Sequence, residues 1–354
     1  MKKSSIAVLF LSISIVLVVY LGYQNLFPQA EPPYDDDQEG LNGQLIFKFS
    51  HVVAENTPKG QAAVKFAELV DEKSNGTIQI VVFPNGSLYS DIEEINALKD
   101  EQVHMIAPST SKLDMLSPEW GVLDLPFAFS EYDAITEGVH GPIGEKLLQS
   151  LQKEGIKGLA HWPNGFKQIT TNKGPVISPE DLAGQNFRIM QSKIIQAQFG
   201  MLGAIAQQES FNSTFKLIEE GKVDGEENTI SNIYSRKFYT VQKHMTITNH
   251  GYLGYAVMMN QDVWDRQSNK TQQILLEAME ETTAWNDENA QKLNEEQLAL
   301  IKENSSIEIH ELSQAEQRQW MERLKPLYEE YEEIIGQELM EELQELKKRY
   351  TYED

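Results

Sequence analysis

Residues 188–228 read RIMQSKIIQAQFGMLGAIAQQESFNSTFKLIEEGKVDGEEN and hold the most structural information in the chain. The segment places Arg188 on an expected strand, follows it with an expected helix over residues 194–202, and closes with an Asp-Gly-Glu-Glu-Asn turn that ends at Asn228. This order of elements is what an α/β lobe needs to hold a guanidinium group beside a side-chain amide. Since a guanidinium keeps its charge and presents five donors in a rigid fork, it suits a two-point grip on a carboxylate.

Strand and helix patterns alternate along most of the chain. β-forming residues predict strands over residues 44–50, 78–83, 103–107, 158–162 and 255–260. Helices are predicted over residues 92–98, 215–220, 271–304 (as one or two helices) and 314–350, the last interrupted at Pro326, while Thr57-Pro58 has the cap residue and first-turn proline that begin a helix. This alternation predicts βαβ units and a mostly parallel sheet.

Size and composition exclude several classes of protein. The chain has 354 residues, 40% of them hydrophobic, and single cores stop growing near ~250–300 residues, so we expect two lobes. The formal net charge of −24 is spread over many segments and opposes binding to the phosphates of a nucleic acid. The chain has no cysteine, which excludes disulfides and thiolate chemistry.

The N-terminal region has the features of an export signal. Lys2 and Lys3 precede an uncharged apolar run over residues 6–23, whose length lies between that of a cleavable signal core and that of a membrane-spanning helix. Two interpretations of residues 1–27 stay open: a signal peptide that is removed, or a membrane anchor that is retained. Residues 28–43 are rich in proline, acid and glycine and are expected to form a flexible linker. In either case we expect an extracytoplasmic protein, secreted or anchored to the outer face of the cytoplasmic membrane.

Eight motifs, in order and in register, support a resemblance to a known family. They are FKFSHVVA (47–54), TPKG (57–60), FPNGSL (83–88), APS (107–109), DLPF (124–127), WPNGFK (162–167), TNHGY (248–252) and the segment 188–228. With these motifs, the chain from about residue 44 to its last helix resembles the extracytoplasmic solute receptors of tripartite ATP-independent periplasmic (TRAP) transporters. The resemblance is to their C4-dicarboxylate-binding subunits in particular.

The resemblance implies a fold as well as a function. It implies an α/β, two-lobe periplasmic-binding-protein-like (type II) fold with long C-terminal helices. One lobe is expected to comprise residues 44–164 and 254–293, and the other residues 165–253 and 294–354. Closure of the two lobes around an organic anion is the expected mechanism.

The resemblance also implies which residues bind the ligand. Arg188 matches the arginine that forms the salt bridge to the ligand carboxylate, although an arginine that caps a helix or pairs with Asp181 is the structural alternative. Lys167 matches a second cationic contact, with a solvent-exposed lysine as its alternative. Asn228 matches an asparagine that binds a ligand oxygen or holds the arginine. Phe211 is similar to the aromatic residue that shields this contact from water, or is an ordinary core residue.

Four further residues are candidates for the same site. Lys59 lies in the first turn of its helix, where a cation opposes the helix dipole; this favours a role other than helix stability, with a surface-exposed lysine as its alternative. His51 and Ser109 follow expected strands, and ligands of open α/β sheets bind beyond the carboxyl ends of the strands. The same argument places Arg188 and Lys167 at the edge of the sheet where the carboxyl ends of these strands lie. A structural histidine within the fold is the alternative for His51. His250 lies in a matching motif, where cleft lining and core packing both stay open.

The sequence does not favour an enzyme. Glu226 and Glu227 are adjacent and would point apart on a strand or turn, which makes a poor acid–base pair. The chain lacks the nucleophile, metalloprotease, phosphate-loop and dinucleotide motifs, and its seven histidines have no metal-ligand spacing. No cofactor or metal is expected.

The expected partners follow from the resemblance. The ligand is a small organic acid, with succinate, malate and fumarate favoured and a uronate or another carboxylate as the alternative. The receptor is expected to deliver it to integral membrane subunits of a TRAP-type secondary transporter. A receptor that presents its ligand to a membrane histidine kinase, a sensor kinase, is the second interpretation.

Overall fold

A computed structural model of the protein describes residues 44–350. The predicted signal peptide or anchor (1–27) and linker (28–43) lie outside these residues. Between residues 44 and 350, no helix has both the length and the apolar character that crossing a bilayer requires.

The described chain contains one mixed β-sheet, whose strand order is β2-β1-β3-β8-β4-β7-β5-β6, with β9 paired to β8. Its strands are β1 (Leu45–Ser50), β2 (Ile78–Phe83), β3 (Met105–Ile106), β4 (Ile156–Thr171), β5 (Asn186–Ile189), β6 (Ile205–Gln208), β7 (Gly225–Thr229), β8 (His244–Asn260) and β9 (Glu308–Glu311). Five pairs of strands are parallel: β1–β2, β1–β3, β5–β6, β5–β7 and β8–β9. Three pairs are antiparallel: β3–β8, β8–β4 and β4–β7. The prediction of a mostly parallel sheet therefore holds for its flanks and is wrong for its centre.

Two long strands form that centre. β4 has 16 residues and β8 has 17, whereas the sequence predicted only residues 158–162 and 255–260 of them. The pairing register shifts at three places along β4, one of them between Pro163 and Gly165, and Gly165 has φ 139°. Because Pro and Gly interrupt strand patterns, the sequence signal ended where the strand continues through an irregularity. Both strands run through the halves that were predicted as separate lobes, so the residue boundaries of the lobes stay a prediction.

The segment ending at Asn228 is a strand and not the predicted turn. Gly225 begins β7 and pairs with Phe187 on β5 and with Thr171 on β4. A Cβ atom at Gly225 would lie 2.3 Å from the carbonyl oxygen of Thr170. The glycine is therefore required by the close approach of two strands and not by a left-handed turn.

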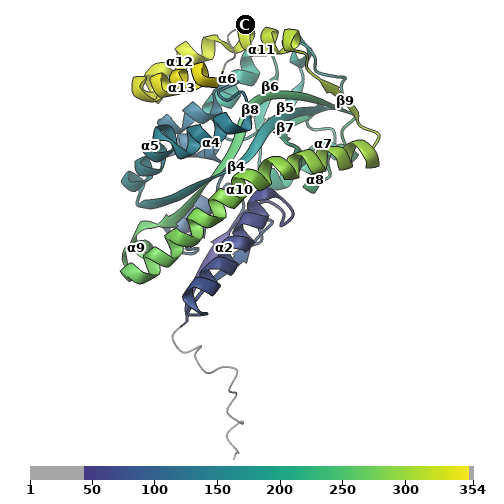
Figure 1. Cartoon of the computed structure of the whole chain (residues 1–354). Helices are drawn as coiled ribbons and strands as arrows, with labels where there is room; N and C mark the ends of the chain where they lie inside the picture. Colours follow the sequence, from purple (N-terminus) through teal and green to yellow (C-terminus); the bar gives the residue numbers. More distant parts are fainter. Residues whose placement is uncertain (1–43, 351–354) are drawn as a thin grey trace, which may run out of the picture. The chain divides into compact units, whose positions relative to one another are not determined.

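Helices cover the sheet, and α10 crosses the centre of the molecule in Figure 1. The helices are α2 (Pro58–Ser74), α3 (Glu94–Lys99), α4 (Tyr132–His140), α5 (Pro142–Ser150), α6 (Lys193–Met201), α7 (Thr214–Glu219), α8 (Ile230–Ser235), α9 (Gln261–Asp265), α10 (Asn269–Asn304), α11 (Gln314–Leu324), α12 (Pro326–Ile335) and α13 (Gln337–Tyr350). The expected cap at Thr57 is present, since its side chain accepts the N–H of Gly60. The predicted interruption at Pro326 is confirmed, and a second one occurs at Gly336, where φ is 100°.

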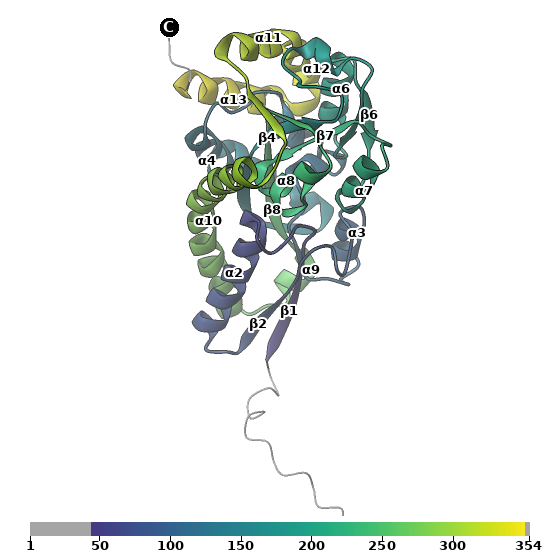
Figure 2. The ribbon, with the colours of Figure 1, turned by 90° about the vertical axis from the view of Figure 1, so that its right-hand side faces the viewer.

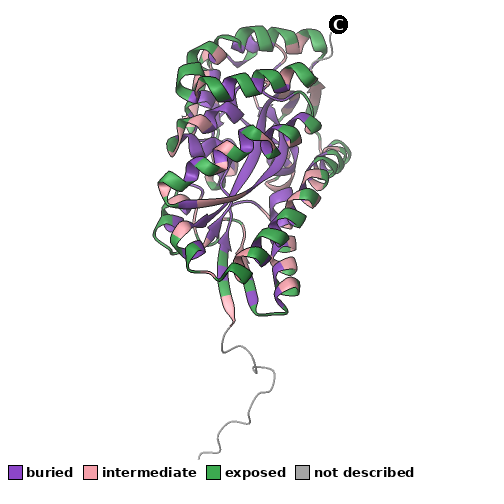
Figure 3. Cartoon of the chain, turned by 60° about the vertical axis from the view of Figure 1, so that its left-hand side comes forward, coloured by how far each residue is buried: buried purple, intermediate pink, exposed green. Residues whose placement is uncertain are grey.

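The helices lie on both sides of the strands. In Figure 2, α2 and α10 lie side by side on one side, while α6 and α7 lie next to β6 on the other. Figure 3 shows that buried residues are concentrated in the strands and that exposed ones lie on the outer faces of the helices. The central strands β4 and β8 are buried along most of their length, so polar side chains on them are held away from water.

Candidate ligand-binding site

A small internal cavity of about 30 Å³ brings together several of the predicted residues. It is lined by Val52, Val53, Lys59, Asp91, Glu94, Ser109, Lys112, Arg188, Met190, Phe211, Asn228, Asn232, Leu253 and Tyr255. The volume is that of one or two water molecules. In this form of the protein the cavity is too small for an organic acid.

Arg188 forms one wall of this cavity. It is the third residue of β5, is fully buried, and donates from Nε to the carbonyl oxygen of Glu209 at 3.1 Å. Its Nη1 and Nη2 atoms have no hydrogen-bond partner among the described residues. Burial lowers the pKa of Arg188, and Glu226 opposes this shift. The two unpartnered donors are those that a carboxylate would occupy in a bidentate pair.

Asn228 and Glu226 support Arg188 from β7. Asn228 donates from Nδ2 to Oε2 of Glu226 at 3.1 Å, and its Oδ1 accepts from Nδ2 of Asn232 at 2.8 Å. The other oxygen of Glu226 accepts from the hydroxyl of Thr170 at 3.1 Å. Burial raises the pKa of Glu226 to about 7, although Asn228 and Arg188 lower it. Asn228 therefore lines the cavity while its polar atoms fix Glu226 and Asn232.

Two lysines come from the other side of the cavity. Lys59 donates from Nζ to the carbonyl oxygen of Ala107 at 2.8 Å, and Nζ lies 3.7 Å from the centre of the Tyr255 ring. Lys112, on the 3-10 helix η2 (Thr110–Met115), forms a buried ion pair of 2.5 Å with Asp91. Burial lowers the pKa of Lys59 to about 7 against the opposing effect of Glu94 and Asp91. Lys59, a cation in the first turn of its helix, is therefore buried and lines the cavity.

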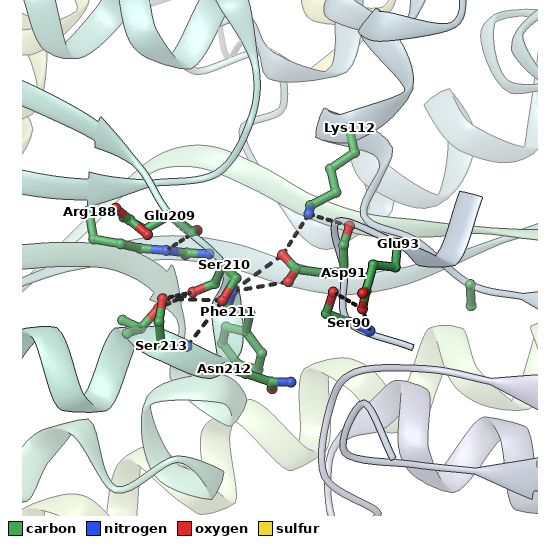
Figure 4. A network of polar contacts seen from close by, with 12 residues as sticks. Ser90, Asp91, Glu93, Lys112, Arg188, Glu209, Ser210, Phe211, Asn212 and Ser213 are labelled. Carbon is green, nitrogen blue, oxygen red and sulfur yellow. Dashed lines mark hydrogen bonds and ion pairs between the residues drawn. The ribbon is translucent and has the colours of Figure 1, made fainter. Parts of the chain in front are cut away.

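Phe211 joins the two sides. Figure 4 shows Asp91 between Lys112 and the backbone of Phe211, whose N–H lies 3.3 Å from each carboxylate oxygen of Asp91. The Phe211 ring is flanked by two guanidinium groups, with Arg236 4.7 Å and Arg188 5.9 Å from its centre. The Phe211 ring thus lies beside the Arg188 guanidinium at the cavity, and its role in shielding a ligand contact stays a prediction.

Lys167 and His250 lie in a separate buried cluster. Lys167 is in the interior of β4 and not at its carboxyl end, and its Nζ lies 3.2 Å from both oxygens of Glu227. Nε2 of His250 lies 3.4 Å from Glu227, and its Nδ1 lies 2.6 Å from the hydroxyl of Thr248. Burial would raise the pKa of Glu227, but Lys167 and His250 outweigh it and lower the pKa. Neither Lys167 nor His250 lines the cavity of Arg188.

His51 and Ser109 both follow their strands as expected, but only Ser109 lines the cavity. Ser109 lines the cavity, and its hydroxyl has no partner among the described residues. His51 is fully buried beside the Phe49 ring and does not line the cavity, and burial together with Lys59 lowers its pKa to about 3. The alternative partner of Arg188, Asp181, instead accepts from the N–H of Ser178 at 2.7 Å.

Several cavity residues were not predicted from the sequence. Asp91, Glu94, Lys112, Asn232 and Tyr255 line it alongside the predicted residues. Lys112 lies three residues after the APS motif, and this proximity was the one local signal for it. The others are brought to the cavity by packing between distant segments. Within the part of the chain that the structure describes, no group of three or more His, Cys, Asp or Glu could hold a metal ion.

The fold and the buried arginine beside two lysines define a solute-binding protein. The chain matches the model of the bacterial extracellular solute-binding protein family 7 over residues 49–334 and belongs to this family. Members of the family are binding receptors of transporters and not enzymes.

Individual relatives cover nearly the whole chain. It is 60% identical over 347 residues to the C4-dicarboxylate-binding protein DctB of Bacillus subtilis (strain 168), covering 98% of this chain and 99% of the relative. A TRAP periplasmic solute-binding protein of Shewanella oneidensis, solved with bound succinate, is 39% identical with a TM-score of 0.83 and covers 86% of this chain and 99% of its own. A TRAP periplasmic solute-binding protein from Pseudomonas aeruginosa PAO1, solved with bound L-malate, is 36% identical with a TM-score of 0.79. The match covers 81% of this chain and 100% of that protein. The chain thus has the two-lobe α/β fold of TRAP solute-binding proteins.

Proposed function

We propose that this protein binds a C4-dicarboxylate between its lobes and delivers it to a TRAP-type secondary transporter. The observation that supports this most directly is the pair of unpartnered Nη atoms of buried Arg188 in a cavity that also contains Lys59 and Lys112. A dicarboxylate has two negative ends and needs two positive ones. Arg188 would hold one carboxylate, and Lys59 with Lys112 would attract the other. The succinate and L-malate in related structures support the same ligand class.

Closure strengthens these contacts. An ion pair in a cavity from which water is excluded is stronger than one in solvent, provided that each charge keeps its partners. The bond from Phe211 to Asp91 links the segment after β6 with the segment before α3 and would form as the lobes close. We therefore propose that the closed receptor is the form that the membrane subunits recognise.

A panel of organic acids tests the ligand. Thermal unfolding should be measured with succinate, malate, fumarate, a uronate and a monocarboxylate of similar size. The C4-dicarboxylates are expected to raise the melting temperature most, because a ligand at a hundredfold its Kd adds ~2.7 kcal/mol of stability. A larger shift with the uronate or the monocarboxylate would overturn the assignment to C4-dicarboxylates.

The proposed location and partners have their own tests. We propose that residues 1–27 either direct export and are removed or hold the receptor at the outer face of the cytoplasmic membrane; Lys2 in the intact mass of the mature protein would establish the anchor. Co-purification with membrane channel subunits is the expected result. Co-purification with a histidine kinase in their place would favour the sensing role.

A further inference from the structure

Glu94 is a buried acid that lines the same cavity as Arg188, Lys59 and Lys112. It is the first residue of α3 and its exposed fraction is 0%. Neither Oε1 nor Oε2 has a hydrogen-bond partner among the described residues. An ionised carboxylate without partners is costly to bury, so Glu94 needs either a proton or a ligand group.

The charged groups around Glu94 come from several elements. Lys59 approaches from α2 and Lys112 from η2, while Asp91 precedes α3 and is paired with Lys112. Tyr255 on β8 is the other titratable neighbour, and Arg188 lies in the same cavity on β5. Beyond this shell, Glu226 lies next to Arg188, and Arg236 lies over Phe211.

The charges in the cavity do not match a dianion while Glu94 is ionised. Three cations line the cavity (Lys59, Lys112 and Arg188), and two carboxylates (Asp91 and Glu94) leave a single positive charge in excess. A dicarboxylate with both groups ionised brings two negative charges. The closed cavity is neutral only if one acid carries a proton. The Asp91 carboxylate holds an ion pair and accepts the backbone N–H of Phe211 at both of its oxygens, whereas Glu94 has no such partner.

We propose that Glu94 is a ligand-binding residue that takes up a proton from solvent when a dicarboxylate is enclosed, and that its carboxyl O–H then donates to a ligand oxygen. This proposal rests on the proposed function. Under this proposal the receptor binds the dicarboxylate dianion and, at the same time, one proton on Glu94. Burial raises the pKa of Glu94 to about 7, with Lys59 and Lys112 opposing the shift, and a nearby dianion would raise it further.

Calorimetry measures the proton directly. Succinate should be titrated into the full-length receptor at about pH 7.5 in buffers that differ in their enthalpy of ionisation. The slope of the observed enthalpy against the buffer enthalpy gives the number of protons taken up for each ligand bound. We expect roughly one for the wild type, and an affinity that falls as pH rises, by at most about tenfold per pH unit.

Two matched variants locate the proton. Glu94→Gln keeps a donor in the same place without titrating, so the succinate binding that this variant retains should show proton uptake near zero and little dependence on pH. Glu93→Gln, at the adjacent exposed position, should retain the uptake of the wild type. Uptake that persists in Glu94→Gln would place the proton on another group, such as Lys59 or Glu226, and would overturn the proposal.

An infrared difference spectrum of the wild-type protein with and without succinate provides a test that needs no variant. Binding should add the C=O band of a protonated carboxyl group. Succinate binding without this band and without proton uptake would refute the role of Glu94 and leave the proposed function intact. No binding of succinate, malate or fumarate by any method would instead refute the proposed function.

Discussion

The carboxylate of Asp91 accepts the backbone N–H of Phe211, 120 residues further along the chain, at 3.3 Å to each oxygen. The same carboxylate forms a 2.5 Å ion pair with Lys112, and both charged side chains are about 5% exposed. One buried acid thus fixes a lysine of the cavity and the loop that carries Phe211. Such a pair contributes less through its own attraction than through the cost of leaving one partner unpaired.

Asp91→Asn is therefore expected to destabilise the protein. The variant leaves Lys112 buried without its counter-charge, and the free energy of unfolding should fall by about 3–5 kcal/mol. Urea denaturation measures this, with Asp100→Asn at an exposed position as the control. The double variant Asp91→Asn/Lys112→Met should recover part of the loss. A double variant that is less stable than Asp91→Asn would contradict the interpretation.

Arg188→Lys tests the shape of the binding group separately from its charge. Lysine keeps the positive charge but loses the two parallel donors of the guanidinium, so the affinity for succinate should fall by about 10- to 100-fold. Arg188→Ala should lose more, on the order of 2–5 kcal/mol of binding free energy. Calorimetry measures both, and Arg318→Lys on the exposed face of α11 is the control. Affinity in Arg188→Lys equal to that of the wild type would show that charge alone suffices.

The elements with local signals were predicted well. The Thr57 cap with the following proline, the β-forming residues at 78–83 and the interruption at Pro326 each depend on neighbouring residues, and each was located to within a few residues. The strand that carries Arg188 was located in the same way, from the segment that surrounds it, whereas the role of Arg188 at the ligand stays a prediction. These features are set by interactions within a few residues of chain.

The features without a local signal depend on contacts between distant segments. Lys167 was expected at the ligand, and the structure pairs its Nζ with Glu227, which lies on the neighbouring strand β7 and is opposite Ile169 in the register. No local pattern predicts that pairing. Glu94 was missed for the same reason, since its burial results from the packing of α3 against other elements around the cavity. The fold class and part of the cavity lining could thus be predicted from the sequence, whereas residues such as Asp91, Glu94 and Lys112 required the tertiary structure.

Gly225→Ala tests the corrected assignment of β7. An added Cβ would lie 2.3 Å from the carbonyl oxygen of Thr170 and close to the Phe187 ring, so we expect a loss of about 1–3 kcal/mol or more in unfolding free energy. Gly200→Ala is the matched control, because nothing lies within 4 Å of its Cβ and it is within α6. There alanine should stabilise the helix by up to ~1 kcal/mol. Equal effects of the two substitutions would contradict the close strand contact at Gly225.

Acid should destabilise the protein partly through His161. This residue is 1% exposed, and its Nε2 lies 3.0 Å from the carbonyl oxygen of Gly144. Burial, with a smaller effect from His140, lowers its pKa from 6.5 to about 4. For a base whose pKa is lowered by folding, the stabilising contribution is present above the unfolded pKa and is lost as pH falls towards the folded one. At ~1.36 kcal/mol per pKa unit the full loss between about pH 6.5 and 4 is roughly 3 kcal/mol.

His161→Gln should reduce this dependence on pH, because glutamine does not titrate. Urea denaturation at about pH 7 and about pH 4.5 would give the difference in unfolding free energy for each protein. The wild type should lose more stability between the two conditions than His161→Gln, whereas His310→Gln, at a partly exposed position on β9, should behave like the wild type. A loss in His161→Gln as large as that of the wild type would mean that the histidine is not held neutral by burial and that other groups cause the acid sensitivity.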